Sequence, residues 1–313
     1  MPDTASLAGR RRVLVTGATG FIGRHVVAAL EARGDVVVAW SRRPERVAAL
    51  CGAAVEAVAH LEQLPATLPL DAIVNLAGAP ILGPPWTTGR RALLRESRID
   101  TTRAVVALCA RLATPPRVLV SASAIGYYGP RGAETLDEAS PPQRVFQSEL
   151  CDAWEHSAAA ATALGVRVVP LRFGVVLGTD GGALPLLARP VRLGLGTILG
   201  SGRQGAPWIH IADATRLVLF ALDTPTLQGP VNAVAPATPS HREFQEALGT
   251  VLHRPIWLHI PALLLRAALG EMAQLLVDGQ FIVPSRALAA GFTFQHPRLI
   301  DALSNLLTPQ PQR

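Results

Sequence analysis

The order of apolar and polar positions divides the chain into short apolar runs and longer stretches with helical periodicity. Apolar runs bounded by turn residues are typical of strands, and apolar residues three or four apart are typical of helices. Strands are expected at 13–15, 36–40, 71–76, 117–121, 166–171, 208–211 and 231–234. Helices are expected at 23–33, 87–112, 148–164, 213–222 and 242–252. The alternation predicts an α/β fold, a doubly wound parallel sheet with helices on both faces.

The pattern loosens after about residue 174, where Gly, Pro and aliphatic residues dominate. We therefore expect a main domain over residues 12–175 and a smaller lobe with a helical C-terminal region over residues 176–307. Parts of 206–235 are expected to complete the sheet of the main domain. No internal repeat or low-complexity linker separates the two parts, so the lobe is expected to pack on the sheet.

Composition and charge narrow the function only slightly. Of 313 residues, 49% are hydrophobic and 17% charged, which is an ordinary globular composition. The net charge of +6 arises from 29 basic and 23 acidic residues, and every basic residue is an arginine. Arginine suits bidentate phosphate contacts, which favours anionic ligands, but a genomic composition bias explains the arginine content better. The arginines are scattered and lack interleaved aromatic residues, so nucleic acid is not expected as a partner.

The cysteines and the hydropathy of the chain indicate the cellular compartment in which the protein is expected. Cys51, Cys109 and Cys151 lie far apart and form neither a metal-binding spacing nor a disulfide framework, which suits a reducing compartment without a metal site. The first ten residues lack the apolar segment of a secretory signal. The most apolar stretch, 256–277, is interrupted by charges and predicts a packed helix, not a membrane span. A cytoplasmic protein without membrane contact is the expectation.

A glycine-rich turn follows the first expected strand and opens the first expected helix. Its first glycine, Gly17, permits a tight turn, Gly20 lets the backbone approach a pyrophosphate, and Gly23 allows the helix to pack close to the strand. The helix N-terminus would present N–H groups and a positive dipole end to the phosphates. The turn predicts a dinucleotide cofactor, and a purely structural turn is the weaker alternative. The expected contacts are Thr16, Gly17, Thr19, Gly20, Phe21, Ile22 and Gly23.

The end of the second expected strand indicates which nicotinamide cofactor is preferred. NAD-preferring sites place Asp or Glu there to bind the ribose 2′-hydroxyl. Here the residues are Ser41, Arg42 and Arg43, and two guanidinium groups could hold a 2′-phosphate. NADP(H) is the predicted cofactor, with ordinary surface arginines as the alternative interpretation.

Seven segments carry a resemblance to a known family: TGATGFIG (16–23), NLAGAPI (75–81), SASAIGYYG (121–129), ELCDAWE (149–155), GSGRQ (200–204), WIHIAD (208–213) and the run from GEMA to GF (270–292). They resemble the extended short-chain dehydrogenase/reductases, in particular an atypical branch of epimerase-like proteins related to the bacterial protein YfcH, with its C-terminal epimerase-associated region. The resemblance extends from about residue 12 to 307. It implies a Rossmann-type NADP(H)-binding domain over 12–175 and a small substrate lobe over 176–307.

The chain departs from that family at its catalytic pair. Such enzymes usually place a tyrosine and a lysine four residues apart on one helix, where the lysine lowers the tyrosine pKa and binds the nicotinamide ribose. Aligned through Glu155, the expected helix has Gln147 at the tyrosine position and Cys151 at the lysine position. Because the chain contains no lysine, the usual pair cannot exist. Cys151 as a nucleophile is less favoured than Cys151 as a small buried apolar residue.

The carboxyl ends of the parallel strands are the expected place for chemistry, since such folds bind ligands there. Ser123 and one of the two tyrosines, Tyr127 or Tyr128, are the candidate catalytic residues, although tyrosine in a turn is also a common packing residue. Further cofactor contacts are expected from residues at the strand ends. These are Leu76, Ala77, Gly78, Ser121 and Arg172, the last with a structural ion pair as an equal alternative.

Candidate substrate contacts lie further along the chain. Arg203, in a Gly-rich loop, could clamp a phosphate or carboxylate, and His210 could donate to the same group or be a satisfied structural histidine. Arg95 and Arg98 on the long helix could reach the cleft, but a solvated or ion-paired face is favoured. Solvation is also the expectation for the acidic helix face of Glu149, Asp152 and Glu155.

Two functions compete at this point. The favoured one is an NADP(H)-dependent oxidoreductase or epimerase that acts on a small anionic substrate, with a nucleotide-sugar as one option and a homodimer as one assembly. The alternative is a non-catalytic NADP(H)-binding sensor or regulatory protein, motivated by the absent tyrosine–lysine pair. The residues leave the choice between them open.

Overall fold

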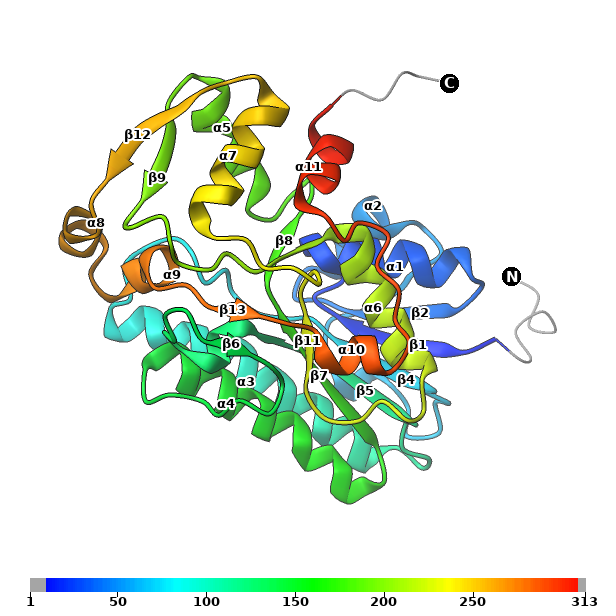
Figure 1. Cartoon of the computed structure of the whole chain (residues 1–313). Helices are drawn as coiled ribbons and strands as arrows, with labels where there is room; N and C mark the ends of the chain where they lie inside the picture. Colours follow the sequence, from blue (N-terminus) through cyan, green and yellow to red (C-terminus); the bar gives the residue numbers. More distant parts are fainter. Residues whose placement is uncertain (1–9, 309–313) are drawn as a thin grey trace.

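Seven parallel strands form the central sheet of the computed structural model, which describes residues 10–308 (Figure 1). The expectation about a secretory signal concerns residues that lie, except for Arg10, outside that range. The strand order is β11-β7-β5-β4-β1-β2-β3. The strands are β1 (Arg12–Thr16), β2 (Val36–Trp40), β3 (Glu56–Val58), β4 (Ala72–Asn75), β5 (Val118–Ala124), β7 (Arg167–Phe173) and β11 (Val231–Ala233). The order reverses between β1 and β4, where doubly wound sheets form their ligand crevice.

Helices cover both faces of this sheet, as predicted for a Rossmann-type fold. One face carries α1 (Phe21–Ala32) and α6 (Ile211–Asp223), and the other carries α3 (Thr88–Arg111) and α4 (Phe146–Ala159). Within β1, Val13 and Val15 join the core under α1, whereas Leu14 joins the opposite core. Because both faces are buried, the strands are continuous apolar runs, which explains why they were recognisable in the sequence. Short α2 (Val47–Cys51) follows β2.

The part of the chain that follows β7 builds a smaller assembly beside the sheet and contributes one strand, β11, to it. Strand β11 pairs with β7 at the sheet edge, whereas the expected strand at 208–211 forms a separate pair. The separate pairs are β8 (Val175–Leu177) with β10 (Trp208–His210), β9 (Gly196–Leu199) with β12 (Ile256–Ile260), and β6 (Thr135–Leu136) with β13 (Phe281–Ile282). The helices are α5 (Leu184–Arg192), α7 (His241–Leu252), α8 (Ala262–Leu269), α9 (Gln274–Val277), α10 (Ser285–Ala289) and α11 (Leu299–Leu307).

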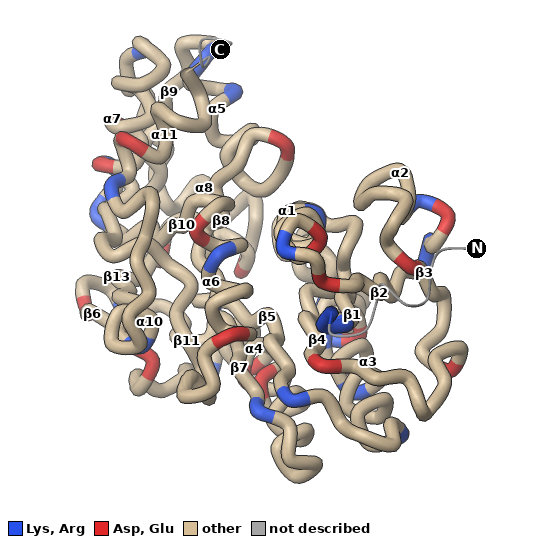
Figure 2. The backbone as a smooth tube through the Cα atoms, turned by 90° about the vertical axis from the view of Figure 1, so that its right-hand side faces the viewer, with Lys and Arg blue, Asp and Glu red and all other residues tan. Residues whose placement is uncertain are grey.

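The prediction of one packed helix over 256–277 is wrong. That stretch begins as strand β12, and Pro261 then stands at the N-cap of the short helix α8. None of the residues of α8 is buried, and Leu263 and Leu264 are 77% and 60% exposed. Over residues 10–308 no helix is long and apolar enough to cross a membrane. Basic and acidic positions are interspersed along the chain (Figure 2).

Candidate functional site

The glycine-rich turn has the close contacts that its sequence requires. Gly17 has a φ of +67°, and a Cβ there would lie 2.8 Å from the carbonyl carbon of Leu76. A Cβ on Gly23 would lie 2.1 Å from the carbonyl oxygen of Gly17, so only glycine lets α1 approach β1 this closely. Helix α1 starts without a side-chain cap at the exposed Gly20, which leaves its N-terminal N–H groups for a ligand. These features fit a pyrophosphate.

Phe21, the first residue of α1, is enclosed by three glycines of the loop after β8. A Cβ on Gly178, Gly181 or Gly182 would lie 2.6 Å from the Phe21 ring. In the same loop Asp180 forms an ion pair with Arg24 and a 3.2 Å contact with His25 Nε2, both on α1. The loop that leads into α5 is therefore fixed against the helix that would bind the phosphates.

Buried hydroxyl and amide groups hold the strand ends together beside this turn. Thr16 donates to Asn75 Oδ1 over 2.7 Å and accepts from the backbone N–H groups of Leu76 and Ala77 over 3.1 Å. Asn75 Nδ2 in turn donates to Ser121 and Thr102. Because Thr16 and Ser121 are 1% exposed, their hydroxyls position the loop after β4 and face the protein interior. Leu76 and Ala77 are half-buried, and Gly78 is exposed.

Ser41, Arg42 and Arg43 follow β2 at the same edge, because Trp40 pairs with Thr16. The Ser41 hydroxyl accepts from the backbone N–H of Arg43 over 3.1 Å. Both arginines are exposed, and neither has a carboxylate partner among residues 10–308. Two unpaired guanidinium groups therefore stand beside the turn, an arrangement that fits a 2′-phosphate.

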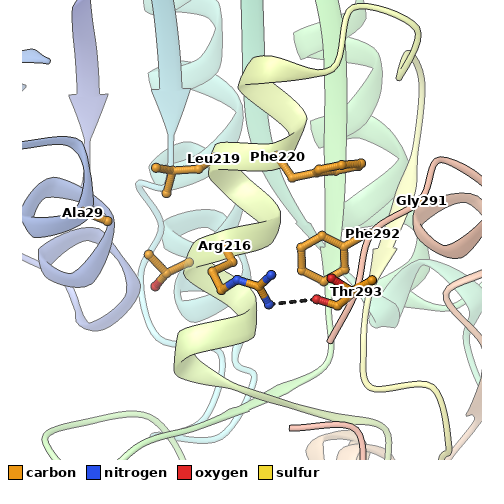
Figure 3. Close-up of a pocket in the computed structure, with 8 residues that line it drawn as sticks. Ala29, Arg216, Leu219, Phe220, Gly291, Phe292 and Thr293 are labelled. Carbon is orange, nitrogen blue, oxygen red and sulfur yellow. Dashed lines mark hydrogen bonds between the residues drawn. The ribbon is translucent and has the colours of Figure 1, made fainter. Parts of the chain in front are cut away.

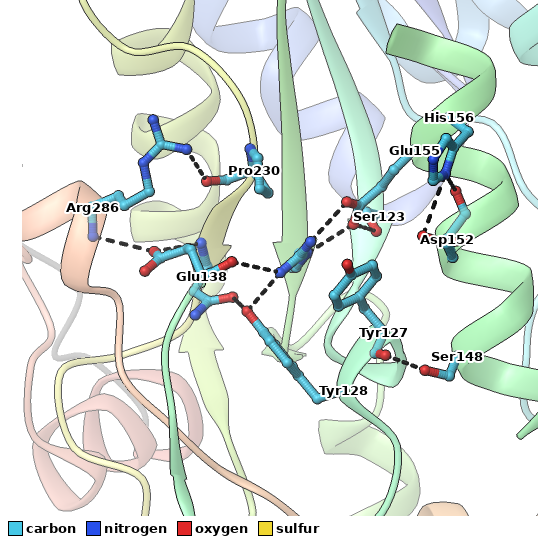
Figure 4. Close-up of polar contacts among 12 residues, drawn as sticks. Ser123, Tyr127, Tyr128, Glu138, Ser148, Asp152, Glu155, His156, Pro230 and Arg286 are labelled. Atoms are coloured by element: carbon cyan, nitrogen blue, oxygen red, sulfur yellow. Dashed lines mark hydrogen bonds and ion pairs between the residues drawn. The ribbon is translucent and has the colours of Figure 1, made fainter. Parts of the chain in front are cut away.

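Ser123 lies opposite Arg172 on the neighbouring strand, and both contact Glu155 of α4. Figure 4 shows Ser123 and Glu155 side by side. The Ser123 hydroxyl donates to Glu155 Oε1 over 2.6 Å, and Arg172 forms a two-pronged ion pair with Glu155 at 2.8 and 2.9 Å. Burial alone would lower the pKa of Arg172, but the hydrogen bonds and charge of Glu155 raise it above its ordinary value. The structural ion pair, one of the two interpretations of Arg172, is thus present in the structure.

Glu155 corrects the expectation of a solvated acidic face. Its side chain is only 11% exposed, because Ser123 and Arg172 occupy its oxygens, whereas Glu149 is exposed as expected. The signal that could have revealed it is Arg172, a charged residue in the buried part of strand β7, which needs a buried partner.

The two tyrosines differ in accessibility. Tyr128 is fully buried; its hydroxyl donates to Asn232 Oδ1 over 2.6 Å and accepts from Arg172, and burial raises its pKa to about 12. Tyr127 is half-buried, and its ring centroid lies 3.4 Å from the Arg172 guanidinium carbon. Burial raises the pKa of Tyr127, with partial compensation by Arg172. Of the two, Tyr127 is the one with surface left for a ligand.

Gln147 and Cys151 stand on the face of α4 that packs against η4 (Ile125–Tyr128). A Cβ on Gly126 would lie 3.5 Å from Cys151 Sγ and 3.6 Å from Gln147 Cβ. Gln147 is 3% exposed, and its Oε1 atom has no hydrogen-bond partner among residues 10–308. Burial raises the pKa of the Cys151 thiol to about 12, which disfavours a thiolate nucleophile.

The two predicted substrate contacts have different surroundings. Arg203 is exposed in the loop between β9 and β10. His210 is 4% exposed; its Nδ1 accepts from the Ala212 N–H, its Nε2 contacts Asn305, and its ring stacks on His296. Both ring nitrogens already have partners within the protein. The geometry therefore supports a structural role for His210, the second of the two interpretations, and not contact with substrate.

Figure 3 shows the residues that line a hollow of about 420 Å³. Its lining comes from α1, α6 and the segment Gly291–Thr293, with Arg216 donating to the Thr293 carbonyl oxygen. None of the predicted site residues lines it, so it does not belong to the candidate site.

Comparisons with known proteins agree with this geometry. The model of the NAD dependent epimerase/dehydratase family matches residues 13–234, and a domain of unknown function, DUF1731, matches residues 260–306. The mouse epimerase family protein SDR39U1 is 39% identical over 301 residues, which cover 95% of this chain and 99% of that protein.

Two solved structures are similar over most of the chain. The crystal structure of human epimerase family protein SDR39U1 with NADPH has a TM-score of 0.84 and 35% identity, covering 94% of this chain and 98% of that one. The nucleoside-diphosphate sugar epimerase from Corynebacterium glutamicum has a TM-score of 0.77 and 29% identity, covering 96% of this chain and 58% of that one.

Replacing Glu155 by Gln should destabilise the fold, because Arg172 would keep a buried charge without its counter-ion. We expect the free energy of unfolding to fall by about 3 kcal/mol. Glu149→Gln on the same helix is the control and should cost at most about 1 kcal/mol, since Glu149 is exposed. Urea denaturation measures both, and equal losses would contradict a stabilising role for the pair.

The buried His210 should make stability depend on pH. Burial and the neighbouring His296 lower its pKa from 6.5 to about 4. Between these values the unfolded chain binds a proton that the folded chain does not, so stability falls as the pH drops from 6.5 towards 4. The loss is expected to be on the order of 3 kcal/mol.

His210→Asn retains a helix-capping side chain but does not titrate. Its stability profile between pH 6.5 and 4, measured by urea denaturation, should be shallower than that of the unmodified protein. Burial also lowers the pKa of His241 to about 4. His241→Asn is therefore the matched variant for comparison with His210→Asn, since each removes one histidine with a lowered pKa. An unchanged slope in His210→Asn would show that His210 is not a buried neutral group.

Proposed function

The chain belongs to the NAD dependent epimerase/dehydratase family, and from that premise we propose that it is an NADP(H)-dependent oxidoreductase or epimerase. One observation carries the proposal: the glycine turn, the unpaired Arg42 and Arg43 and the polar end of β5 all lie along one edge of the sheet. A doubly wound sheet binds dinucleotides across that edge, at its switch point.

The preference for NADP(H) rests on charge. No carboxylate stands at the end of β2 to accept from a ribose 2′-hydroxyl, and two exposed arginines stand there instead. The human relative, 35% identical, has been crystallised with NADPH. A 2′-phosphate would gain two charge-assisted hydrogen-bonding partners in this chain.

The proposed chemistry divides between cofactor and protein. Bound NADP(H) would supply or accept the hydride at the nicotinamide ring. Ser123 would accept a hydrogen bond from a substrate hydroxyl, because its own proton is donated to Glu155 Oε1 over 2.6 Å, and the half-buried Tyr127 would shield this end of the sheet from water. The buried Tyr128 keeps Arg172 in place.

The substrate is proposed to be small and anionic, with nucleotide-sugars as the first class to test. The exposed Arg203, in the Gly-rich loop of the smaller lobe, supports an anionic group. The similar Corynebacterium glutamicum protein is described as a nucleoside-diphosphate sugar epimerase, which favours the same class. We also propose that the protein forms a homodimer and that it belongs to the YfcH-related branch of the family.

A second function is favoured by one specific observation. Gln147 and Cys151 occupy the positions where related enzymes have their tyrosine and lysine, and neither can transfer a proton near neutral pH. A chain of this kind would serve as an NADP(H)-dependent regulatory protein, with cofactor binding changing its affinity for a partner.

Cofactor binding is tested by titrating the purified protein with NADPH and NADH in a calorimeter. We expect NADPH to bind at least about tenfold more tightly than NADH, and the double variant R42Q/R43Q to lose that difference. R10Q, which removes an arginine whose side chain contacts Gly34 away from the turn, should retain it. Equal affinities for the two cofactors in the unmodified protein would contradict the NADP(H) preference.

Turnover separates the two functions. An enzyme should oxidise NADPH, or convert a nucleotide-sugar with bound cofactor, within a panel of sugar nucleotides and carbonyl compounds, and Ser123→Ala should lower kcat by about a hundredfold. A regulatory protein should bind NADPH without any turnover, and co-precipitation should recover a partner only with, or only without, NADPH.

A further inference from the structure

Arg98 stands on α3 directly beneath the loop that follows β4. Its Nη2 donates to the Ala79 carbonyl oxygen over 2.9 Å, and its Nη1 donates to the Leu94 carbonyl oxygen over 3.1 Å. A Cβ added to Gly78 would lie 3.3 Å from the Arg98 guanidinium carbon. The absence of a side chain at Gly78 therefore leaves the guanidinium close to the backbone that lines the carboxyl edge of the sheet.

This cation lacks an anionic partner. No carboxylate lies within ion-pair distance of Arg98 in the part of the chain that the structure describes. A guanidinium has five N–H donors, of which the hydrogen bonds to Ala79 and Leu94 use two. The side chain is only partly exposed, and burial lowers its pKa. None of its N–H donors is a buried atom without a partner, so the remaining donors are open to a ligand.

Arg98 also faces α4, where its guanidinium carbon lies 5.2 Å from the Trp154 ring centroid. On α3 itself, the like charge of Arg90 adds to the effect of burial and lowers the pKa of Arg98 further. Two helices thus hold, at the end of β4, a cation without a carboxylate partner among residues 10–308, and its free N–H donors fit a polar ligand there.

The sheet topology assigns this place to one half of the cofactor. A dinucleotide lies across the switch point between β1 and β4. Arg42 and Arg43, beyond β1 on the β2 side, mark the half that carries the 2′-phosphate. The nicotinamide half would then lie over the ends of β4 and β5, above Gly78 and Arg98.

We propose that Arg98 binds the ribose of the nicotinamide half, so that a guanidinium from α3 does what a lysine at position 151 of α4 would do in a related enzyme. This inference rests on the proposed NADP(H) site. The planar guanidinium can donate to two vicinal hydroxyl oxygens at once, and its positive charge would stabilise negative charge developing on a nearby substrate oxygen. Arg98 reaches the ribose from below the loop, where Gly78 leaves room.

Two ligands that share only one half of the cofactor test the assignment. NADPH and 2′,5′-ADP are titrated into the full-length protein and its variants by calorimetry, because 2′,5′-ADP has the 2′-phosphate but no nicotinamide half. We expect Arg98→Gln to weaken the binding of NADPH at least about tenfold and to change the affinity for 2′,5′-ADP less than about twofold. Arg98→Lys keeps a positive charge, so its affinity for NADPH should stay within about threefold of that of the unmodified protein.

Arg103→Gln is the matched control, because Arg103 is on the same helix, is 70% exposed and pairs with Asp100. It should change neither affinity. Equal weakening of both ligands by Arg98→Gln, or no weakening of either, would overturn the role of Arg98 while leaving the cofactor proposal intact. Failure of the unmodified protein to bind either ligand would overturn both proposals. Thermal unfolding of each variant establishes that it is folded, and Arg98→Lys decides the question if Arg98→Gln is not.

Discussion

The approach of the first helix to the first strand is the constraint on which the rest of the site depends. The carbonyl oxygen of Gly17 lies where a side chain on Gly23 would begin, and the backbone of Leu76 lies where a side chain on Gly17 would begin. Three backbone segments are therefore in contact without side chains between them. Because of this contact, the uncapped end of α1, the end of β2 and the end of β4 face the same space.

The elements of the sheet could be predicted from the sequence because they are buried on both faces. Residues 36–40 were expected as a strand, and β2 has those bounds. The smaller lobe was harder to predict, since its strands are short and their partners are distant. Ile198 of β9, for example, pairs with His259 of β12, and no local periodicity marks such a pair. Proline at 185 and 190 also hid α5.

The parts of the candidate site that depend on backbone conformation could be predicted from the sequence. The parts that depend on contacts between side chains of different helices and strands were harder to predict. Glycine spacing indicated the turn, but nothing local to α4 shows that Glu155 is buried or that Glu149 is not. For the same reason the sequence could not separate Arg98 from Arg95: a solvated or ion-paired face was favoured for both, but Arg98 lies half-buried under Gly78 without a carboxylate partner among residues 10–308, whereas Arg95 is exposed. In both cases the decisive neighbour is far away in the sequence, so only the folded chain reveals the chemistry.

The socket around Phe21 has a consequence for how this protein can change over evolution. Gly178 and Gly181 leave the space that the ring occupies, and either could carry a side chain only if the ring became smaller. Gly182 differs, because its φ of +71° and the Val176 carbonyl oxygen, 2.6 Å from a Cβ there, require glycine whatever the ring. Substitutions at Phe21, Gly178 and Gly181 are therefore not independent, and the fitness effect of each depends on the residue present at the others. Among related sequences the aromatic residue and these two glycines should be kept or lost together, as a single inherited unit that joins the first helix to the smaller lobe.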